Sequence, residues 1–139
     1  MNLIIDVGNS WVKMAVYNGS QILHHKSMQQ EDLKREVQKV IRAYPKISHS
    51  ILAAVTPVAN EIIDILKKNS EAHILHSASR FPFKNKYGTP DTLGLDRIAL
   101  VAAATEAYPN TNVLINDAGS CITYDFLNAR GENMGGAIS

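Results

Sequence analysis

Residues 3–13 constrain the fold of this chain most, because their pattern predicts two strands joined by a tight turn. The apolar run that ends at Val7 is typical of a buried strand. Gly8-Asn9 is a turn signal, since both residue types tolerate positive φ. Apolar side chains then recur at every second position along residues 11–17, as in a strand with one buried face. The chain is therefore expected to begin with a β-hairpin.

The turn of this hairpin carries residue types that can bind a phosphate. Asp6, just before the turn, can hold Mg²⁺ directly or through water, and Lys13, just after it, can neutralise a phosphate. The turn amides, with the small hydroxyl of Ser10 among them, can cradle phosphate oxygens. The same residues also suit a plain hairpin in which Asp6 and Asn9 only form the turn, and the segment alone leaves both interpretations open.

A second copy of the pattern occurs late in the chain. Asp117 and Gly119 repeat the spacing of Asp6 and Gly8, and alternation resumes through the apolar residues at 122, 124 and 126. Two hairpins with an Asp-x-Gly turn predict two related domains that face each other across a nucleotide. Chance similarity is the alternative, because such turns are common in hairpins.

Between and after the hairpins, the pattern predicts alternating strands and helices. Apolar residues at helical spacing mark the helices, with the charged side chains on the opposite face. The expected elements are a strand over 21–28, a helix over 30–44, a strand over 50–55, a helix over 60–69, a strand over 72–75, a loop over 77–89, a helix over about 95–108 and three strands after 113.

The third helix begins with a second candidate site. Asp96 and Arg97 fall in its first turn, where the helix dipole favours an ionised carboxylate, and Gly94 leaves room for a ligand. The residue types alone favour a simpler interpretation, in which Asp96 only interacts with the dipole and Arg97 is a surface charge.

Length and composition limit the number of domains, the partners and the cellular location that are expected. A chain of 139 residues, 45% of them hydrophobic, suffices for one domain and part of another. A net charge of +1, without runs of like charge, gives no sign of a nucleic-acid or membrane partner. The single Cys121 excludes an intrachain disulfide and fits a reducing compartment. Since residues 98–104 are too few to span a bilayer and Asp6 interrupts any signal peptide, a cytoplasmic location is expected.

Taken together, the motifs resemble those of the type III pantothenate kinases, a family of the acetate kinase/sugar kinase/Hsp70/actin superfamily. Each motif alone is weak, but all of them occur in the family's order over the whole chain. They are Asp6-Val7-Gly8-Asn9-Ser10 with Lys13, Tyr87-Gly88-Thr89-Pro90, Gly94-Leu95-Asp96-Arg97, Asp117-Ala118-Gly119-Ser120 and Gly135-Gly136-Ala137-Ile138. Ser10 and Ser120 stand where the family usually has threonine, and both keep the hydroxyl.

The resemblance implies an α/β fold of the ribonuclease H-like, actin-like ATPase type, with a mixed sheet flanked by helices and a duplicated domain. Residues 1–112 would form the first domain, with the phosphate-binding hairpin and the substrate loop. Residues 113–139 would begin a second, incomplete domain, since the family continues well past this point. Its three strands, without roughly a hundred further residues, would form a sheet with no covering helix, an apolar face and an open edge.

The resemblance also implies ATP-dependent phosphorylation of pantothenate by a homodimer, the first step of coenzyme A biosynthesis. Positioning and charge neutralisation dominate phosphoryl transfer, so the site needs a phosphate cradle, cations and a carboxylate near the attacking hydroxyl. ATP and its Mg²⁺ would be held by Asp6, Val7, Gly8, Asn9, Ser10, Trp11, Val12, Lys13 and Ser120. Potassium or ammonium would bind at Asp117. Pantothenate would be held by Tyr87, Gly94, Leu95, Asp96 and Arg97, with Asp96 as the general base.

Two other functions remain open at this point. A non-catalytic regulator on the same scaffold would bind nucleotide or pantothenate and contact a partner protein; the shortness of the chain favours it slightly. The intact acidic and basic motif residues argue against it. A ribonuclease H-like nuclease would need several clustered carboxylates for two metals and a basic surface, which the balanced charge does not supply.

Overall fold

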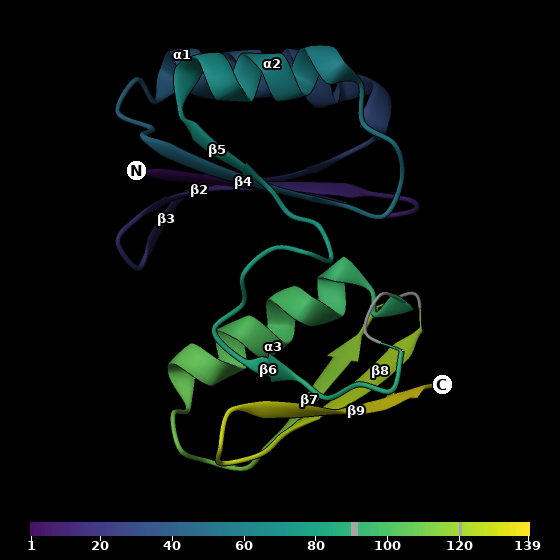
Figure 1. Cartoon of the computed structure of the whole chain (residues 1–139). Helices are drawn as coiled ribbons and strands as arrows, with labels where there is room; N and C mark the ends of the chain where they lie inside the picture. Colours follow the sequence, from purple (N-terminus) through teal and green to yellow (C-terminus); the bar gives the residue numbers. More distant parts are fainter. Residues whose placement is uncertain (90–91, 120) are drawn as a thin grey trace. The chain divides into compact units, whose positions relative to one another are not determined.

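A computed structural model describes residues 1–89, 92–119 and 121–139 of the chain. These residues form two compact units, Met1–Leu75 and His76–Ser139, each with its own sheet and hydrophobic core (Figure 1). None of the described helices is both long and apolar enough to cross a membrane.

The first unit is a five-stranded mixed sheet with two helices on one face (Figure 1). The strand order is β3-β2-β1-β4-β5, in which β1, β2 and β3 are antiparallel and β4 and β5 run parallel to β1. Its elements are β1 (Asn2–Val7), β2 (Val12–Asn18), β3 (Gln21–Met28), the 3-10 helix η1 (Gln30–Asp32), α1 (Leu33–Ala43), β4 (His49–Ala54), α2 (Asn60–Asn69) and β5 (Glu71–Ile74). This is the predicted order of elements, with the first expected helix divided into η1 and α1.

Strand alternation places the core of this unit between the sheet and the two helices. The inward residues of β1 and β2 pack with apolar residues of α1 and α2 at helical spacing. Members of this core include Leu3, Ile5, Val7, Val12, Met14, Val16, Leu33, Val37, Val40, Leu52, Ile62 and Leu66. Ile4 points the other way and is 36% exposed, so β1 is covered by helices on one face only.

Glu36 is an exception to the predicted polar face of α1. It is buried, and its carboxylate accepts hydrogen bonds from Lys26 at 2.7 Å, Lys39 at 3.0 Å and Arg35 at 3.3 Å. The hydrogen bonds from Lys26 and Lys39 are the main reason why the pKa of Glu36 falls from 4.5 to about 2. Three neighbouring cations therefore compensate this buried charge, which links α1 to β3.

The second unit contains a four-stranded sheet in the order β6-β9-β8-β7 and helix α3. Its elements are β6 (Lys84–Asn85), α3 (Leu95–Ala107), β7 (Val113–Ala118), β8 (Ile122–Leu127) and β9 (Glu132–Ile138). The helix and the last three strands lie where the sequence predicts them. The loop expected over residues 77–89 contains β6, which pairs in parallel with β9. Local pattern could not show this strand, because its partner lies far along the chain.

Helix α3 covers one face of the second sheet. Ile98, Val101 and Ala104 pack with Leu127 of β8 and with Phe83, so the expectation of a sheet without any covering helix is wrong for this face. On the other face, apolar side chains are exposed, as expected. They are Leu114 at 68%, Ile122 and Phe126 at 39% and Met134 at 50%.

The alternation in β8 has the opposite sense to the one that its apolar residues suggest. Ile122 and Phe126 are exposed, whereas Thr123, Asp125 and Leu127 are buried toward α3. The buried positions of β8 include the polar residues Thr123 and Asp125. In the sequence, the exposed face with Ile122 and Phe126 is therefore the more apolar one and resembles a buried face.

The boundary between the two compact units falls between Leu75 and His76 in the sequence. The domain boundary expected between residues 112 and 113 rests on the second copy of the hairpin pattern, whereas the boundary at residue 75 rests on contacts within each unit. That boundary stays a prediction.

Candidate functional site

The first hairpin forms where the sequence predicts it. Asp6 stands directly opposite Lys13, and Val7 opposite Val12. The Gly8 N–H donates to the Trp11 carbonyl at 3.0 Å, and a Cβ at Gly8 would lie 3.0 Å from that oxygen. Glycine is therefore favoured at this position by the close approach of the backbone, and its amide closes the turn instead of forming part of an open phosphate cradle.

The other hairpin residues are either exposed at the tip of the turn or buried in the core. Asn9, Ser10 and Trp11 are exposed at the tip, and the Trp11 side chain is 55% exposed. Val7 and Val12 are buried in the core, so only their backbones can face a ligand. A ligand at this turn would thus meet the tip residues and the Asp6–Lys13 edge.

The second hairpin matches the first up to its glycine and then differs. Asp117 stands opposite Thr123, and Ala118 opposite Ile122. The Gly119 N–H donates to the Cys121 carbonyl at 3.0 Å, which closes a turn one residue shorter than the first. Ser120 and Pro90, which belong to the predicted motifs, lie outside the described residues.

The first turn of α3 holds Asp96 in a defined orientation. Asp96 is exposed, and its Oδ1 accepts a hydrogen bond from the Arg97 N–H at 2.8 Å. A Cβ at Gly94 would overlap with Asp96 Oδ1. Gly94 therefore leaves room for the carboxylate of Asp96, and the room expected there for a ligand stays a prediction.

Arg97 is not a surface charge. It is 4% exposed and forms a two-point ion pair with Asp125, which is 2% exposed. Arg97 Nε donates to Asp125 Oδ2 at 2.8 Å, and Nη2 donates to Oδ1 at 2.7 Å. The hydrogen bond with Asp125 is the main cause that raises the pKa of Arg97, against the effect of burial. The sequence did not predict Asp125 as a site residue, because the apolar residues of β8 suggest that the face with Asp125 is exposed.

Tyr87 lies between this ion pair and a glycine. Arg97 Cζ is 5.4 Å from the centroid of the Tyr87 ring, within the range of a cation–π contact. Gly135 has φ +96°, and a Cβ there would lie 2.8 Å from Tyr87 Cδ2. At Gly136 a Cβ would overlap with the Tyr124 carbonyl. The predicted Gly135-Gly136 motif thus lets β9 pass close to Tyr87 and β8.

Tyr87, Asp96, Arg97 and Asp117 all belong to the second unit, where Arg97 contacts both Tyr87 and Asp96, whereas Asp6 and Lys13 belong to the first unit. Asp117 shares the α3-facing side of the sheet with Asp125, because its partner Thr123 is two residues from Asp125 on β8. Among the described residues no cluster of three or more His, Cys, Asp or Glu side chains could hold a metal ion. A site with one carboxylate ligand, such as Asp6, suits Mg²⁺ that is held mostly by phosphate oxygens and water.

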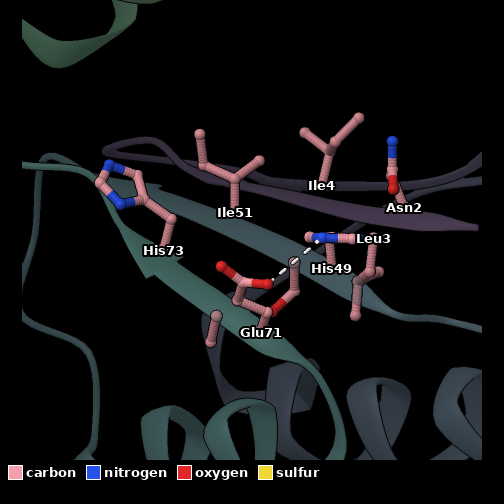
Figure 2. A pocket seen from close by; sticks show the side chains of 9 residues that line it. Asn2, Leu3, Ile4, His49, Ile51, Glu71 and His73 are labelled. Atoms are coloured by element: carbon pink, nitrogen blue, oxygen red, sulfur yellow. Dashed lines mark ion pairs between the residues drawn. The ribbon is translucent and has the colours of Figure 1, made fainter. Parts of the chain in front are cut away.

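The first sheet also has a hollow that none of the predicted site residues lines. It has a volume of about 660 Å³ and lies on the face without helices, where β1, β4 and β5 begin (Figure 2). Ile4 and Ile51 stand on this face, and His49 Nε2 is 3.4 Å from Glu71 Oε2. Because β1, β4 and β5 are parallel, Asp6 lies toward the opposite end of the strands.

Comparison with known proteins adds independent findings. Residues 2–139 match the family model for type III pantothenate kinase. The chain is 44% identical to the type III pantothenate kinase of Christiangramia forsetii and 40% identical to that of Flavobacterium johnsoniae. Each match includes the whole chain, which spans 57% of the length of these curated relatives.

Two solved structures share the fold at low sequence identity. A candidate 2-dehydro-3-deoxygalactonokinase from Sinorhizobium meliloti has a TM-score of 0.60 at 13% identity, over 99% of this chain and 53% of its own. A conserved candidate Baf family transcriptional activator from Campylobacter jejuni has a TM-score of 0.55 at 22% identity, over the same shares. These likenesses confirm the expected actin-like, sugar-kinase type of α/β fold.

Proposed function

Because this chain belongs to the type III pantothenate kinase family, we propose that the protein transfers the terminal phosphoryl group of ATP to pantothenate. The product would be 4′-phosphopantothenate, formed in the first step of coenzyme A biosynthesis. The observation that carries the proposal is the match of residues 2–139 to one kinase family. The exposed and oriented carboxylate of Asp96 in the first turn of α3 supports it, because phosphoryl transfer to an alcohol uses such a base.

The substrate part of the proposed site is in the second unit. Tyr87, Gly94, Leu95 and Arg97 would surround pantothenate, and Asp96 would accept the proton of its attacking hydroxyl. The hydrogen bond from the Arg97 N–H to Asp96 Oδ1 orients the carboxylate, and its exposure makes it accessible to a substrate. A positioned carboxylate is the usual base in phosphoryl transfer to an alcohol, and its main task is orientation.

The ATP part of the proposed site is the hairpin turn of the first unit. Lys13 would neutralise part of the phosphate charge. Asp6, opposite Lys13, would help to hold a Mg²⁺ ion that is bound by the phosphates and that screens the charge of their oxygens. Since the Gly8 amide closes the turn, the phosphate contacts would come from the tip at Asn9, Ser10 and Trp11. Val7 and Val12 would contribute through their backbones alone.

The remaining parts of the proposal rest on the family resemblance. Ser120 would add a phosphate contact, and Asp117, half-buried at the end of β7, would bind potassium or ammonium. The protein would act as a homodimer in the cytoplasm.

The deciding experiment is a direct assay of product formation. The protein at its natural length is mixed with ATP, Mg²⁺, potassium and pantothenate, and phosphopantothenate is measured by mass spectrometry. Product that depends on both ATP and pantothenate is expected. Binding of both ligands without product would contradict the proposal and favour the non-catalytic regulator.

A further inference from the structure

Asp125 is a buried carboxylate that has no role in the proposed reaction. We propose that Asp125 is a positioning residue for Asp96 and that it acts through Arg97. In this proposal the ion pair ties the first turn of α3 to β8 and so keeps the Asp96 carboxylate at one place on the surface. The inference rests on the proposed function, since it assigns Asp96 to the proton transfer.

The geometry of the ion pair restricts motion in a way that a single contact does not. Two nitrogens of one rigid guanidinium meet two oxygens of one carboxylate, at 2.8 and 2.7 Å. This two-point contact fixes the orientation of the Arg97 guanidinium plane as well as its distance from the Asp125 carboxylate. Arg97 Nη2 also approaches the Tyr124 carbonyl at 3.4 Å, so the guanidinium contacts both the side chain and the backbone of β8.

Arg97 transmits this restraint to Asp96 over a very short path. The two residues are neighbours in the first turn of α3, and the Arg97 N–H itself holds Asp96 Oδ1 at 2.8 Å. The first bond of the helix, from the Ile98 N–H to the Gly94 carbonyl at 3.0 Å, spans the same residues. A shift of this turn would therefore move the Asp96 carboxylate directly.

The surroundings argue for orientation as the purpose of the pair. A buried ion pair is weak evidence for stability, because apolar side chains of similar size often stabilise a fold as well or better. Here one face of Arg97 is packed by the Tyr87 ring, which Gly135 in turn approaches closely. The guanidinium is thus restrained by its charge partner and by its neighbours at once.

The test separates turnover from substrate binding. A misplacement of about 1 Å can cost on the order of a hundredfold in rate, so Asp125→Asn is expected to lower kcat by at least about tenfold. The KM for ATP should stay within about threefold, and the KM for pantothenate should change less than kcat, because Asp125→Asn keeps the Arg97 side chain. Glu132→Gln, which weakens the ion pair between Glu132 at the start of β9 and Arg130 in the preceding turn, is the matched control and should keep wild-type kcat. Wild-type kcat in folded Asp125→Asn, or a raised KM for pantothenate at unchanged kcat, would overturn the proposal.

A second variant and a second measurement cover the case in which Asp125→Asn does not fold. The double variant Arg97→Met with Asp125→Leu replaces the pair by apolar side chains and should fold. Because Arg97 is also a proposed pantothenate residue, hydrogen exchange is the measurement for this variant, in place of kinetics. Hydrogen exchange of the Ile98 amide should rise in this variant while the later amides of α3 keep their protection. Unchanged protection of the first turn contradicts the inference whether or not the wild-type protein is a kinase, whereas an inactive wild-type protein contradicts only the proposed function.

Discussion

Arg97 and Asp125 lie 28 positions apart in the chain, yet they form the most deeply buried ion pair among the described residues. Their contact joins the start of α3 to the middle of β8, next to the exposed Asp96. A rigid buried pair and an accessible carboxylate in adjacent positions are a suitable arrangement for a base that must stay in place.

Asp96→Asn is predicted to abolish turnover and to leave ATP binding nearly intact. The amide keeps the size of the side chain but cannot accept the proton, and a general base typically contributes about 10² to 10⁴ in rate. The measurement is steady-state kinetics together with calorimetry for ATP. Glu106→Gln, an exposed change at the other end of α3, serves as the control. Near wild-type turnover in Asp96→Asn would show that Asp96 is not the base.

Lys13→Met is predicted to weaken ATP binding more than pantothenate binding. Lys13 is exposed beside the hairpin turn and opposite Asp6, so its loss removes a positive charge from the proposed phosphate site. Calorimetry with each ligand tests this, with Lys46→Met as an exposed control in the same unit. Equal losses for both ligands would point to a folding defect instead.

Asp117→Ala is predicted to remove activation by potassium or ammonium. Asp117 is half-buried on the α3-facing side of the second sheet, and its carboxylate is the only group that the proposal assigns to this cation. The measurement is the rate as a function of potassium concentration, with sodium as the comparison ion. A variant whose rate still rises with potassium as in the wild type counts against the assignment.

Glu36 is predicted to make the first unit less stable in acid. Its pKa is lower in the folded state, about 2 against 4.5, so its contribution to stability is complete above pH 4.5 and is lost as the pH falls toward 2. Urea unfolding followed across this range should show a steeper loss in the wild type than in Glu36→Gln. Parallel losses in the two proteins would mean that Glu36 is not the group responsible.

The sequence predicted the elements well because their signals are local. The alternation in β2 and the helical spacing in α1 and α2 depend on neighbouring residues, and the helices and strands occur where these patterns place them. The two-residue β6 and the partner of Arg97 depend on pairing between distant segments, which no local pattern contains. Asp125 was missed because the more apolar face of β8 suggested that its own face was exposed.

The 139-residue chain, expressed alone, is predicted to have no kinase activity. It spans 57% of the length of its curated relatives, and one face of its second sheet exposes four large apolar side chains. They are Leu114, Ile122, Phe126 and Met134. Burial of one such side chain is worth about 1.5 to 3 kcal/mol, so an uncovered face forfeits several such contributions and exposes a surface prone to association.

A polypeptide as long as the relatives should cover this face, remain dispersed and phosphorylate pantothenate. The comparison requires both proteins to be verified by intact mass, assayed at equal concentration and examined by size-exclusion chromatography. For the shorter chain we expect self-association and no phosphopantothenate. Robust turnover by a dispersed 139-residue chain would show that the exposed face needs no cover for catalysis and that the described residues contain the complete kinase site.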